Sequence, residues 1–299
     1  MKFLVLIISL LALSCSRPAP DPQAGHSSTM ASTDPARPNP DTLDHAAWFA
    51  GIIAPVKPIH DEADAAITAA NDPVAGDSIV ASYRTRMSTM LRAIGDSLND
   101  NESFMNWLRK DTLGQAAIAR MVRPLGCTLL TTEGLWYVDS DSRDLLARAS
   151  QHCTPAMQRF LKIRATEEAE GFSDDAALVI PWDVVGDRVA TWETFIPASP
   201  GFLLLPEAQY WHDVYLRTYL TGMDNSPIYT FDEATLDPKV RKSYERFTSR
   251  YPDLASTRVV GDYLELLERE GFVETEAVQE FLKEKGIDSM MGMQPPQRL

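Results

Sequence analysis

Five histidines are the side chains best suited to proton transfer or metal binding near neutral pH, and their spacing limits what they can do. His60 stands beside three acids in the segment 60–64, and such side chains can bind a metal ion. Acids at the start of a helix are also favoured by the helix dipole, and that interpretation is simpler. His212 and Asp213 are adjacent, so on a helix they should point apart and form no base with an orienting acid. We therefore expect no metal site.

Motifs of other catalytic classes are missing from the sequence. It contains no Gly-x-Ser-x-Gly elbow, no Walker loop, no Gly-x-Gly-x-x-Gly turn and no His-Glu-x-x-His pattern. Two carboxylates for glycoside hydrolysis can come from any part of a chain, and nothing here selects a pair. The acids between Glu167 and Asp175 lack the spacing of a calcium loop, and we expect a solvated helix end and loop there. The sequence assigns no catalytic residue and no cofactor.

The first fifteen residues have the pattern of a bacterial export signal. Lys2 precedes the apolar run Phe3–Leu13, which as a helix is about 16 Å long, too short for a bilayer core of about 30 Å. The end of the signal, Ala12-Leu13-Ser14-Cys15, resembles the lipobox of bacterial lipoproteins, although that family prefers Leu where Ala12 stands. The resemblance implies a diacylglyceryl group on Cys15, cleavage before it and acylation of the new amine. An ordinary signal peptide with a chance cysteine is the alternative.

This resemblance predicts a protein of the bacterial cell envelope, attached to a membrane through its N-terminal lipid. Ser16 follows the cysteine where an acidic residue would signal inner-membrane retention, which favours the outer membrane and its periplasmic face. Cys127 and Cys153 remain, and an even number of cysteines in an exported protein predicts a disulfide. The bridge would close a loop of about 26 residues and contribute about 3 kcal/mol. Two buried thiols are the alternative.

The charge of the chain excludes one large class of partner. The sequence has 28 Lys and Arg against 42 Asp and Glu, a formal net charge of −14, and loss of Lys2 with the signal makes the protein more acidic. Nucleic-acid binding depends on Lys and Arg, so no nucleic acid is expected as a partner. An anionic membrane surface is excluded as a binding face for the same reason, and the lipid would provide the attachment.

Aromatic residues are denser between positions 182 and 219 than elsewhere. Aromatic side chains dominate many binding surfaces, so this stretch supplies the candidate residues. The alternative is that they form the core between helices. A polar loop, Met223–Pro227, follows them and is a candidate lining of a groove. The predicted binding surface consists of Trp192, Tyr210, Trp211 and Tyr215.

Helices are the elements expected to position these residues. A signal (1–15) and a disordered Pro-rich tether (16–42) precede an α-helical body (43–286), and a loose tail (287–299) follows it. A boundary within the body is expected near 171–181. Spacings of three and four between apolar residues predict long helices over 77–98 and 102–122. Strand-forming residues around Glu133-Gly134 predict one hairpin over 128–139.

The second half of the body contains an internal repeat. The pattern aromatic-Glu-x-Phe, followed four residues later by Pro, occurs at Trp192 and again at Tyr244, 52 residues on. Each copy predicts a helix, a turn containing Pro200 or Pro252, and a second helix. The stretch 192–267 resembles the helical-pair repeats of tetratricopeptide-like periplasmic proteins, although it lacks their Gly/Ala core signature.

We therefore predict an all-α fold, either a bundle or a short helical-repeat array, with at most one small β-hairpin. The functional hypothesis is a cell-envelope lipoprotein that binds or scaffolds an envelope protein partner and is not an enzyme. The alternative is a lipid-anchored periplasmic hydrolase that acts on envelope glycans through carboxylates that the sequence does not assign.

Overall fold

The fold is all-α, as the periodicity predicted. A computed structural model describes residues 40–287, so Cys15, the signal and all but the edges of the predicted tether and tail lie outside the described residues. All described residues belong to one unit. The helices are α1 (Pro40–Ile53), α2 (Val56–Thr68), α3 (Pro73–Asp100), α4 (Glu102–Lys110), α5 (Thr112–Val122), α6 (Ser142–Ala149), α7 (Pro155–Glu170), α8 (Trp182–Phe195), α9 (Leu205–Thr221), α10 (Pro238–Arg250), α11 (Ala255–Arg269) and α12 (Glu276–Glu284).

Short polar side chains set where several helices begin. The Asp72 carboxylate accepts from the backbone N–H groups of Val74 and Ala75, which caps α3. The Asp111 carboxylate accepts from Gly114 N at 2.9 Å and caps α5 in the same way. The sequence had predicted one helix over 102–122. It is two helices, because Asp111 ends α4 in an extended conformation and starts α5.

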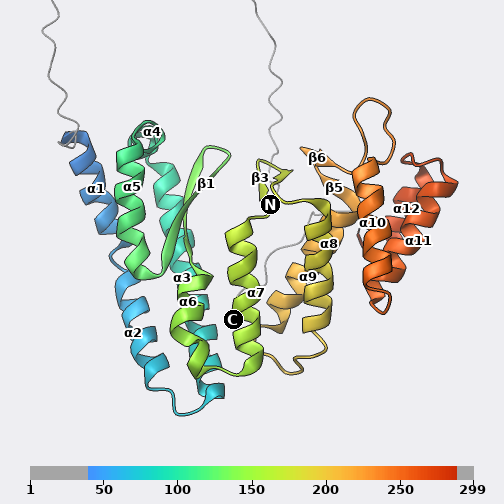
Figure 1. The fold of residues 1–299 in the computed structure, drawn as a ribbon. Helices are drawn as coiled ribbons and strands as arrows, with labels where there is room; N and C mark the ends of the chain where they lie inside the picture. Colours follow the sequence, from blue (N-terminus) through green and yellow to red (C-terminus); the bar gives the residue numbers. More distant parts are fainter. Residues whose placement is uncertain (1–39, 288–299) are drawn as a thin grey trace, which may run out of the picture. The chain divides into compact units, whose positions relative to one another are not determined.

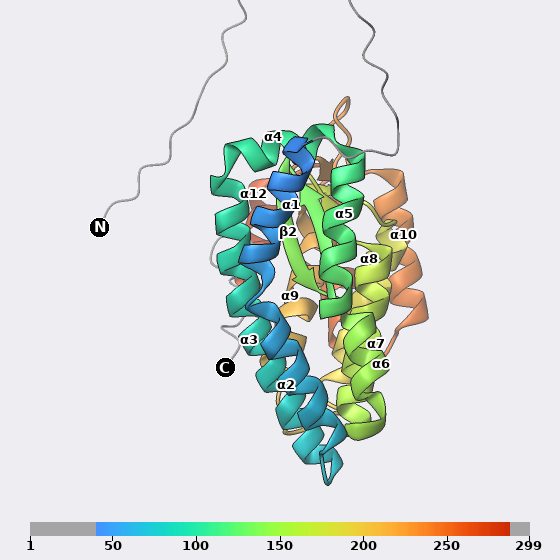
Figure 2. The ribbon, with the colours of Figure 1, turned by 90° about the vertical axis from the view of Figure 1, so that its left-hand side faces the viewer.

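The predicted hairpin is present and pairs β1 (Cys127–Thr132) with β2 (Leu135–Ser140) in antiparallel register. Its turn is Glu133-Gly134, and both residues have positive φ, 51° and 74°, as a two-residue hairpin turn requires. The hairpin lies between α3 and α5 (Figure 2).

Two further hairpins were not expected. They pair β3 (Ser173–Asp174) with β4 (Ala177–Leu178), and β5 (Gly222–Met223) with β6 (Ser226–Pro227). Strands of two residues are too short to show an alternating pattern in sequence. The first of them falls at the predicted boundary near 171–181.

The hairpins stand along one edge of the helices (Figure 1) and bond to one another. Thr132 Oγ1 donates to the Asp174 carboxylate at 2.8 Å, and Asn225 N donates to Ala176 O at 3.0 Å. These hydrogen bonds hold each hairpin in place against the next.

Successive helix pairs end in the same way. Gly171 follows α7, Gly222 follows α9 and Gly271 follows α11, with φ of 76°, 76° and 71°. A positive φ after a helix is most easily adopted by glycine, because it has no Cβ. The predicted repeat corresponds to the pairs α8–α9 and α10–α11, and the pair α6–α7 has the same helix–helix–glycine order. The helices are arranged from α1–α5 at one end to α10–α12 at the other (Figure 1).

Aromatic residues of the repeat fill the core between these pairs. Trp192 and Tyr244, which begin the two copies of the motif, are fully buried, as are Phe195 and Phe247. Burial of each such side chain contributes about 1.5–3 kcal/mol. The motif is therefore repeated because its aromatic residues pack each helix pair against the core.

Candidate functional site

Only two of the four residues of the predicted binding surface are accessible to solvent. Trp192 and Tyr215 are 0% and 1% exposed, so they belong to the core and cannot meet a partner directly. Tyr210 and Trp211 are half-buried on α9. All four lie next to the seam where α7 faces α8 and α9, and this seam contains buried charges.

Glu167 is the buried carboxylate of the seam. Arg164 Nη1 donates to its Oε2 at 2.8 Å, and the Trp192 indole donates to its Oε1 at 2.7 Å. Burial raises the pKa of Glu167, while the arginines beside it and the indole act in the opposite direction. The Arg164 guanidinium also stacks 3.9 Å above the Trp211 ring. Glu167 thus joins α7 to α8.

Arg188 of α8 connects three elements. Its Nη2 donates to Gly171 O at 2.7 Å and to the Glu170 carboxylate at 3.0 Å, at the end of α7. Its Nη1 donates to the Tyr215 hydroxyl on α9 at 3.2 Å. The side chain is 4% exposed. A buried guanidinium with this many partners holds the seam in one register.

A second buried pair links distant parts of the chain. Arg84 of α3 and Glu207 of α9 form an ion pair at 2.6 Å, 123 residues apart, with both side chains almost inaccessible to solvent. The Arg84 guanidinium lies over the Phe160 ring of α7. Such pairs are costly to desolvate, so they specify geometry more than they add stability.

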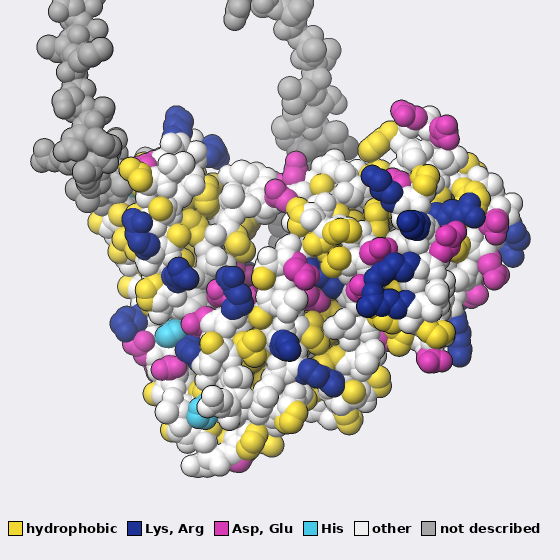
Figure 3. All heavy atoms as spheres, viewed as in Figure 1, with side chains coloured by type: hydrophobic (Ala, Val, Ile, Leu, Met, Phe, Trp, Pro, Cys, Tyr) yellow, Lys and Arg dark blue, Asp and Glu magenta, His cyan; other side chains and the backbone are white. Residues whose placement is uncertain are grey.

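A groove lies directly over the seam network. A cavity of about 390 Å³ between α7 and α8 has Glu167 and Arg188 among its lining, and Arg159 and Lys162 at its exposed rim. A second cavity of about 390 Å³ shares Arg159 and continues to Phe195 and Tyr251. Figure 3 shows Lys and Arg side chains over α7 and around α10 on this face, with Asp and Glu side chains among them. The charges of the groove balance, because its lining holds three basic and three acidic side chains: Arg159, Lys162, Arg188, Glu167, Glu170 and Asp187. The groove is the candidate functional site, because it combines apolar surface with charged side chains of both signs above a floor of buried ion pairs.

His212 and Asp213 do interact, contrary to the expectation from sequence. His212 Nδ1 is 3.0 Å from the Asp213 carboxylate, and Nε2 is 3.8 Å from Glu193 Oε2 on α8. Burial lowers the pKa of His212, but the hydrogen bond to Asp213 and the negative charges of Asp213 and Glu193 outweigh it and raise this pKa to about 9. The imidazole is therefore a cation held between two carboxylates at neutral pH, and a cation is not a general base.

Glu193 also binds the N-terminus of α11. Its carboxylate accepts the backbone N–H groups of Ala255 and Ser256, and the Ser256 hydroxyl also donates to it. These are the first turn of α11, whose own N-cap residue, Leu254, forms no side-chain cap. Glu193 of one helix pair therefore caps a helix of the next.

The predicted disulfide is wrong, because Cys127 and Cys153 are both free and buried. They lie in different surroundings: the Cys127 thiol faces Leu125 O, and Cys153 lies beside Asp77 of α3. Burial, reinforced by nearby carboxylates, raises the pKa of each thiol to about 12. Both remain protonated at neutral pH and are poor nucleophiles.

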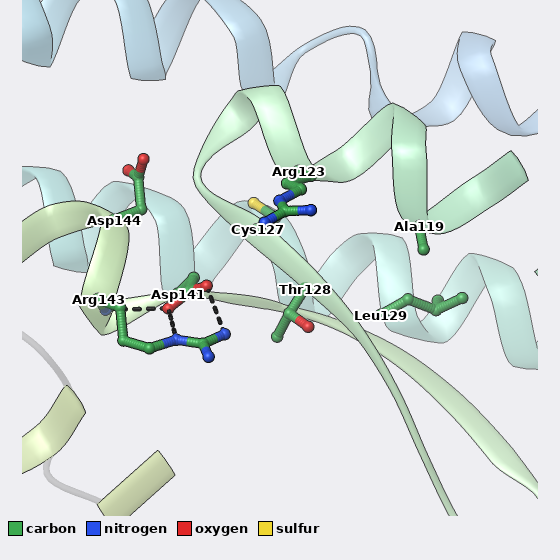
Figure 4. A pocket seen from close by; sticks show the side chains of 8 residues that line it. All are labelled: Ala119, Arg123, Cys127, Thr128, Leu129, Asp141, Arg143 and Asp144. Atoms are coloured by element: carbon green, nitrogen blue, oxygen red, sulfur yellow. Dashed lines mark hydrogen bonds and ion pairs between the residues drawn. The ribbon is translucent and has the colours of Figure 1, made fainter. Parts of the chain in front are cut away.

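Cys127 lines a cavity of about 560 Å³ with Arg123, Asp141 and Arg143 (Figure 4). The Arg143 guanidinium donates twice to the Asp141 carboxylate, at 3.0 and 2.9 Å, so its charge is neutralised within the wall.

The acids after His60 diverge, and each forms an ion pair with a different cation. Within residues 40–287, no group of three or more His, Cys, Asp or Glu side chains is placed to share a metal ion. None of the described helices combines the length and apolarity that a bilayer crossing requires. The pairs are Asp61 with Lys57, Glu62 with Arg86 and Asp64 with Arg148.

Comparison of the chain with protein-family models, with curated proteins and with solved structures finds no match. The function of the groove is therefore inferred from its geometry. The sequence did not reveal Glu167, which was expected to be solvated and is 5% exposed. Its position three residues after Arg164 was the available indication of a pair.

Proposed function

We propose that this chain is a lipid-anchored protein of the bacterial cell envelope that binds or scaffolds an envelope protein and catalyses no reaction. The observation that carries the proposal is the groove over the α7–α8 seam. Buried side chains fix the floor of the groove, and a rigid floor reduces the ordering cost of binding. Helix pairs stacked side by side present such surfaces to extended partners.

The occupant that fits this groove is an extended segment of an envelope protein that carries both apolar and charged side chains, because the lining has basic and acidic residues in equal number. Arg159 and Lys162 are exposed on its rim, and Lys162 has no ion-pair partner among the described residues. Lys162 is therefore available to pair with an acidic side chain of the partner, which would fix the register of the bound segment.

The hydrolase alternative would need a protonated carboxyl group as general acid. Glu167 is the groove carboxyl whose pKa is raised, as such an acid requires. Both of its oxygens already accept hydrogen bonds, from Arg164 and Trp192. That arrangement supports a structural role for Glu167, and with it the binding protein.

The membrane attachment is proposed from the sequence pattern around Cys15. Metabolic labelling with an alkyne fatty acid should modify the full chain, and Cys15→Ser should abolish the label. Fractionation of the envelope should then place the labelled protein in the outer membrane. An unlabelled, soluble periplasmic protein would show an ordinary cleaved signal instead.

Crosslinking in intact envelopes tests the groove. A photo-crosslinking residue at Thr166 or Thr191 faces the groove, and one at exposed Ser97 on α3 is the matched control. We expect one dominant protein adduct from the groove positions, reduced by Lys162→Glu and missing at Ser97. Equal adducts at all three positions, or none together with release of soluble glycan, would refute the proposal.

A further inference from the structure

A separate cavity lies beside the hairpin β5–β6, between it and the helices α11 and α12. Its volume is about 970 Å³, and it shares no lining residue with the α7–α8 groove. The loop Met223–Pro227, which the sequence indicated as the lining of a groove, supplies part of its wall. Ligand pockets range from about 300 to 1,000 Å³, so a space of this size has room for several side chains.

The wall of the cavity is apolar and its rim is charged. The charged side chains of the lining are Asp224, Glu274 and Lys283, and all three are exposed. No ion pair within residues 40–287 includes any of them. An occupant should therefore be mainly apolar and should carry charges of both signs. The apolar wall is formed by Met223, Pro227, Ile228, Val278 and Leu282.

The chain leaves the described structure at the edge of this cavity. Gly286 follows α12 with a φ of 68°, and the Ile287 N–H then donates to Leu282 O at 2.8 Å, so the chain turns back against a residue of the cavity wall. Arg217 of α9 donates to Gly286 O at 2.6 Å, one helical turn before Thr221, which also lines the cavity. Two helices that border the cavity, α9 and α12, thus hold the point from which the chain continues.

The composition of the next residues suits the apolar wall. Ile287, the first residue of the predicted loose tail, is already buried at 6% exposure. The twelve residues 288–299 contain three methionines, Met290, Met291 and Met293. Methionine is flexible enough to fill irregular apolar gaps. Such a segment gains free energy by leaving water where apolar surface is within its reach.

The segment is long enough to fill the cavity. Along α12 the cavity extends from Lys283 to Glu274, which is about 14 Å at about 1.5 Å per residue. An extended chain advances about 3.3 Å per residue, so the methionines between 290 and 293 come within about 10–20 Å of Ile287. They therefore reach the apolar wall without any change in the fold.

The charges of the segment complement those of the rim. The segment contains one acid, Asp288, and one base, Arg298. Asp288 follows the turn at the Lys283 end of the cavity, and Arg298 comes late enough in the chain to reach Glu274 at the other end. Opposite charges at the two ends fix the direction in which the segment lies.

We propose that residues 288–299 fold back along α12 and occupy this cavity, with the methionines on the apolar wall and Arg298 at Glu274. The space beside β5–β6 is then a docking site for the chain's own segment and is closed to other ligands. The proposal does not depend on the α7–α8 groove, so either can fail alone.

Disulfide formation between engineered cysteines tests this in the full chain. Gln279 lines the cavity and Glu280, the next residue of α12, does not, although both are exposed. Under mild oxidation we expect Gln279→Cys/Met291→Cys to form an intramolecular bond at least tenfold faster than Glu280→Cys/Met291→Cys, as measured by mass spectrometry of the linked peptides. The native Cys127 and Cys153 are buried and do not compete. Equal rates would overturn the proposal.

Thermal stability provides an independent readout. Met291→Ser/Met293→Ser should lower the melting temperature by at least about 3 °C, because two apolar side chains lose their burial. Gln294→Ser/Gln297→Ser, in the same segment, is the matched control and should leave it unchanged. An unchanged melting temperature in the methionine variant would show that these side chains are already in water and would overturn the proposal.

The charge pairing is tested by reversing it. Arg298→Glu should slow the bond between the cysteines at 279 and 291 severalfold, and adding Glu274→Lys should restore the rate. A rate that Arg298→Glu leaves unchanged would overturn the placement of the segment along α12. Lys162→Glu should have no effect on this bond, which separates the test from that of the groove.

Discussion

Removal of one partner from the Arg84–Glu207 pair should destabilise the protein far more than removal of both. Arg84→Met leaves the Glu207 carboxylate in an interior where its side chain is 5% exposed. Removing one member of a buried ion pair costs about 3–5 kcal/mol. Loss of the cation–π contact with Phe160 adds about 0.5–2 kcal/mol. For a body of this size the melting temperature should fall by about 10 °C or more.

The double variant Arg84→Met/Glu207→Met should recover most of this loss, because two apolar side chains replace two desolvated charges. Urea unfolding followed by circular dichroism gives the free energies for a double-mutant cycle. Lys57→Met is the matched control, since the Lys57–Asp61 pair is more than half exposed on both sides and should contribute below about 1 kcal/mol. A single variant that costs less than about 1 kcal/mol, or a double variant as unstable as the sum of the singles, would refute this reasoning.

Three further predictions concern the His212 ion pairs, a hairpin and the thiols. The folded-state pKa of His212 is about 9 against 6.5 when unfolded, so its contribution, up to about 3 kcal/mol, should be complete below pH 6.5 and lost as the pH rises through 9. His212→Gln should flatten that part of the stability–pH curve, and an unchanged curve would contradict the ion-pair geometry. Gly222→Ala should cost more than about 1 kcal/mol in urea unfolding, because φ is +76° and a Cβ would lie 2.7 Å from Ser226 O; a neutral substitution would show that the hairpin relaxes. Cys127 and Cys153 should both react with maleimide in urea and neither in buffer, whereas a mass lower by two hydrogens would show a disulfide.

Elements with many apolar residues on one face could be predicted from sequence. The α3 helix repeats apolar residues at three and four over 28 residues, and the Glu133-Gly134 turn is specific for a two-residue hairpin. The break at Asp111 was missed, since an aspartate within a helical pattern is compatible with either a solvated site or a cap. The short hairpins after Gly171 and Gly222 depend on backbone conformation, which leaves little trace in composition.

The candidate site was predicted in part. The sequence located its aromatic residues, but not that Trp192 would use its indole N–H on a buried glutamate. The charges of the seam come from α3, α7, α8 and α9, and a pair such as Arg84 and Glu207 is 123 residues apart. No local pattern can indicate contacts of that separation. The expectation that adjacent residues on a helix point apart was wrong for His212 and Asp213, whose side chains form a hydrogen bond.

The cap that Glu193 provides to α11 has a consequence for cooperativity. In an array of repeats, each unit has its own stability and a coupling to its neighbours. The α11 helix has no side-chain cap from its own N-cap residue, and Glu193 of α8 provides the cap instead. The α11 helix is therefore less stable on its own than when it is packed against α8. The pair α10–α11 should then be unable to persist when α8–α9 unfolds, and the two pairs should unfold as one cooperative unit.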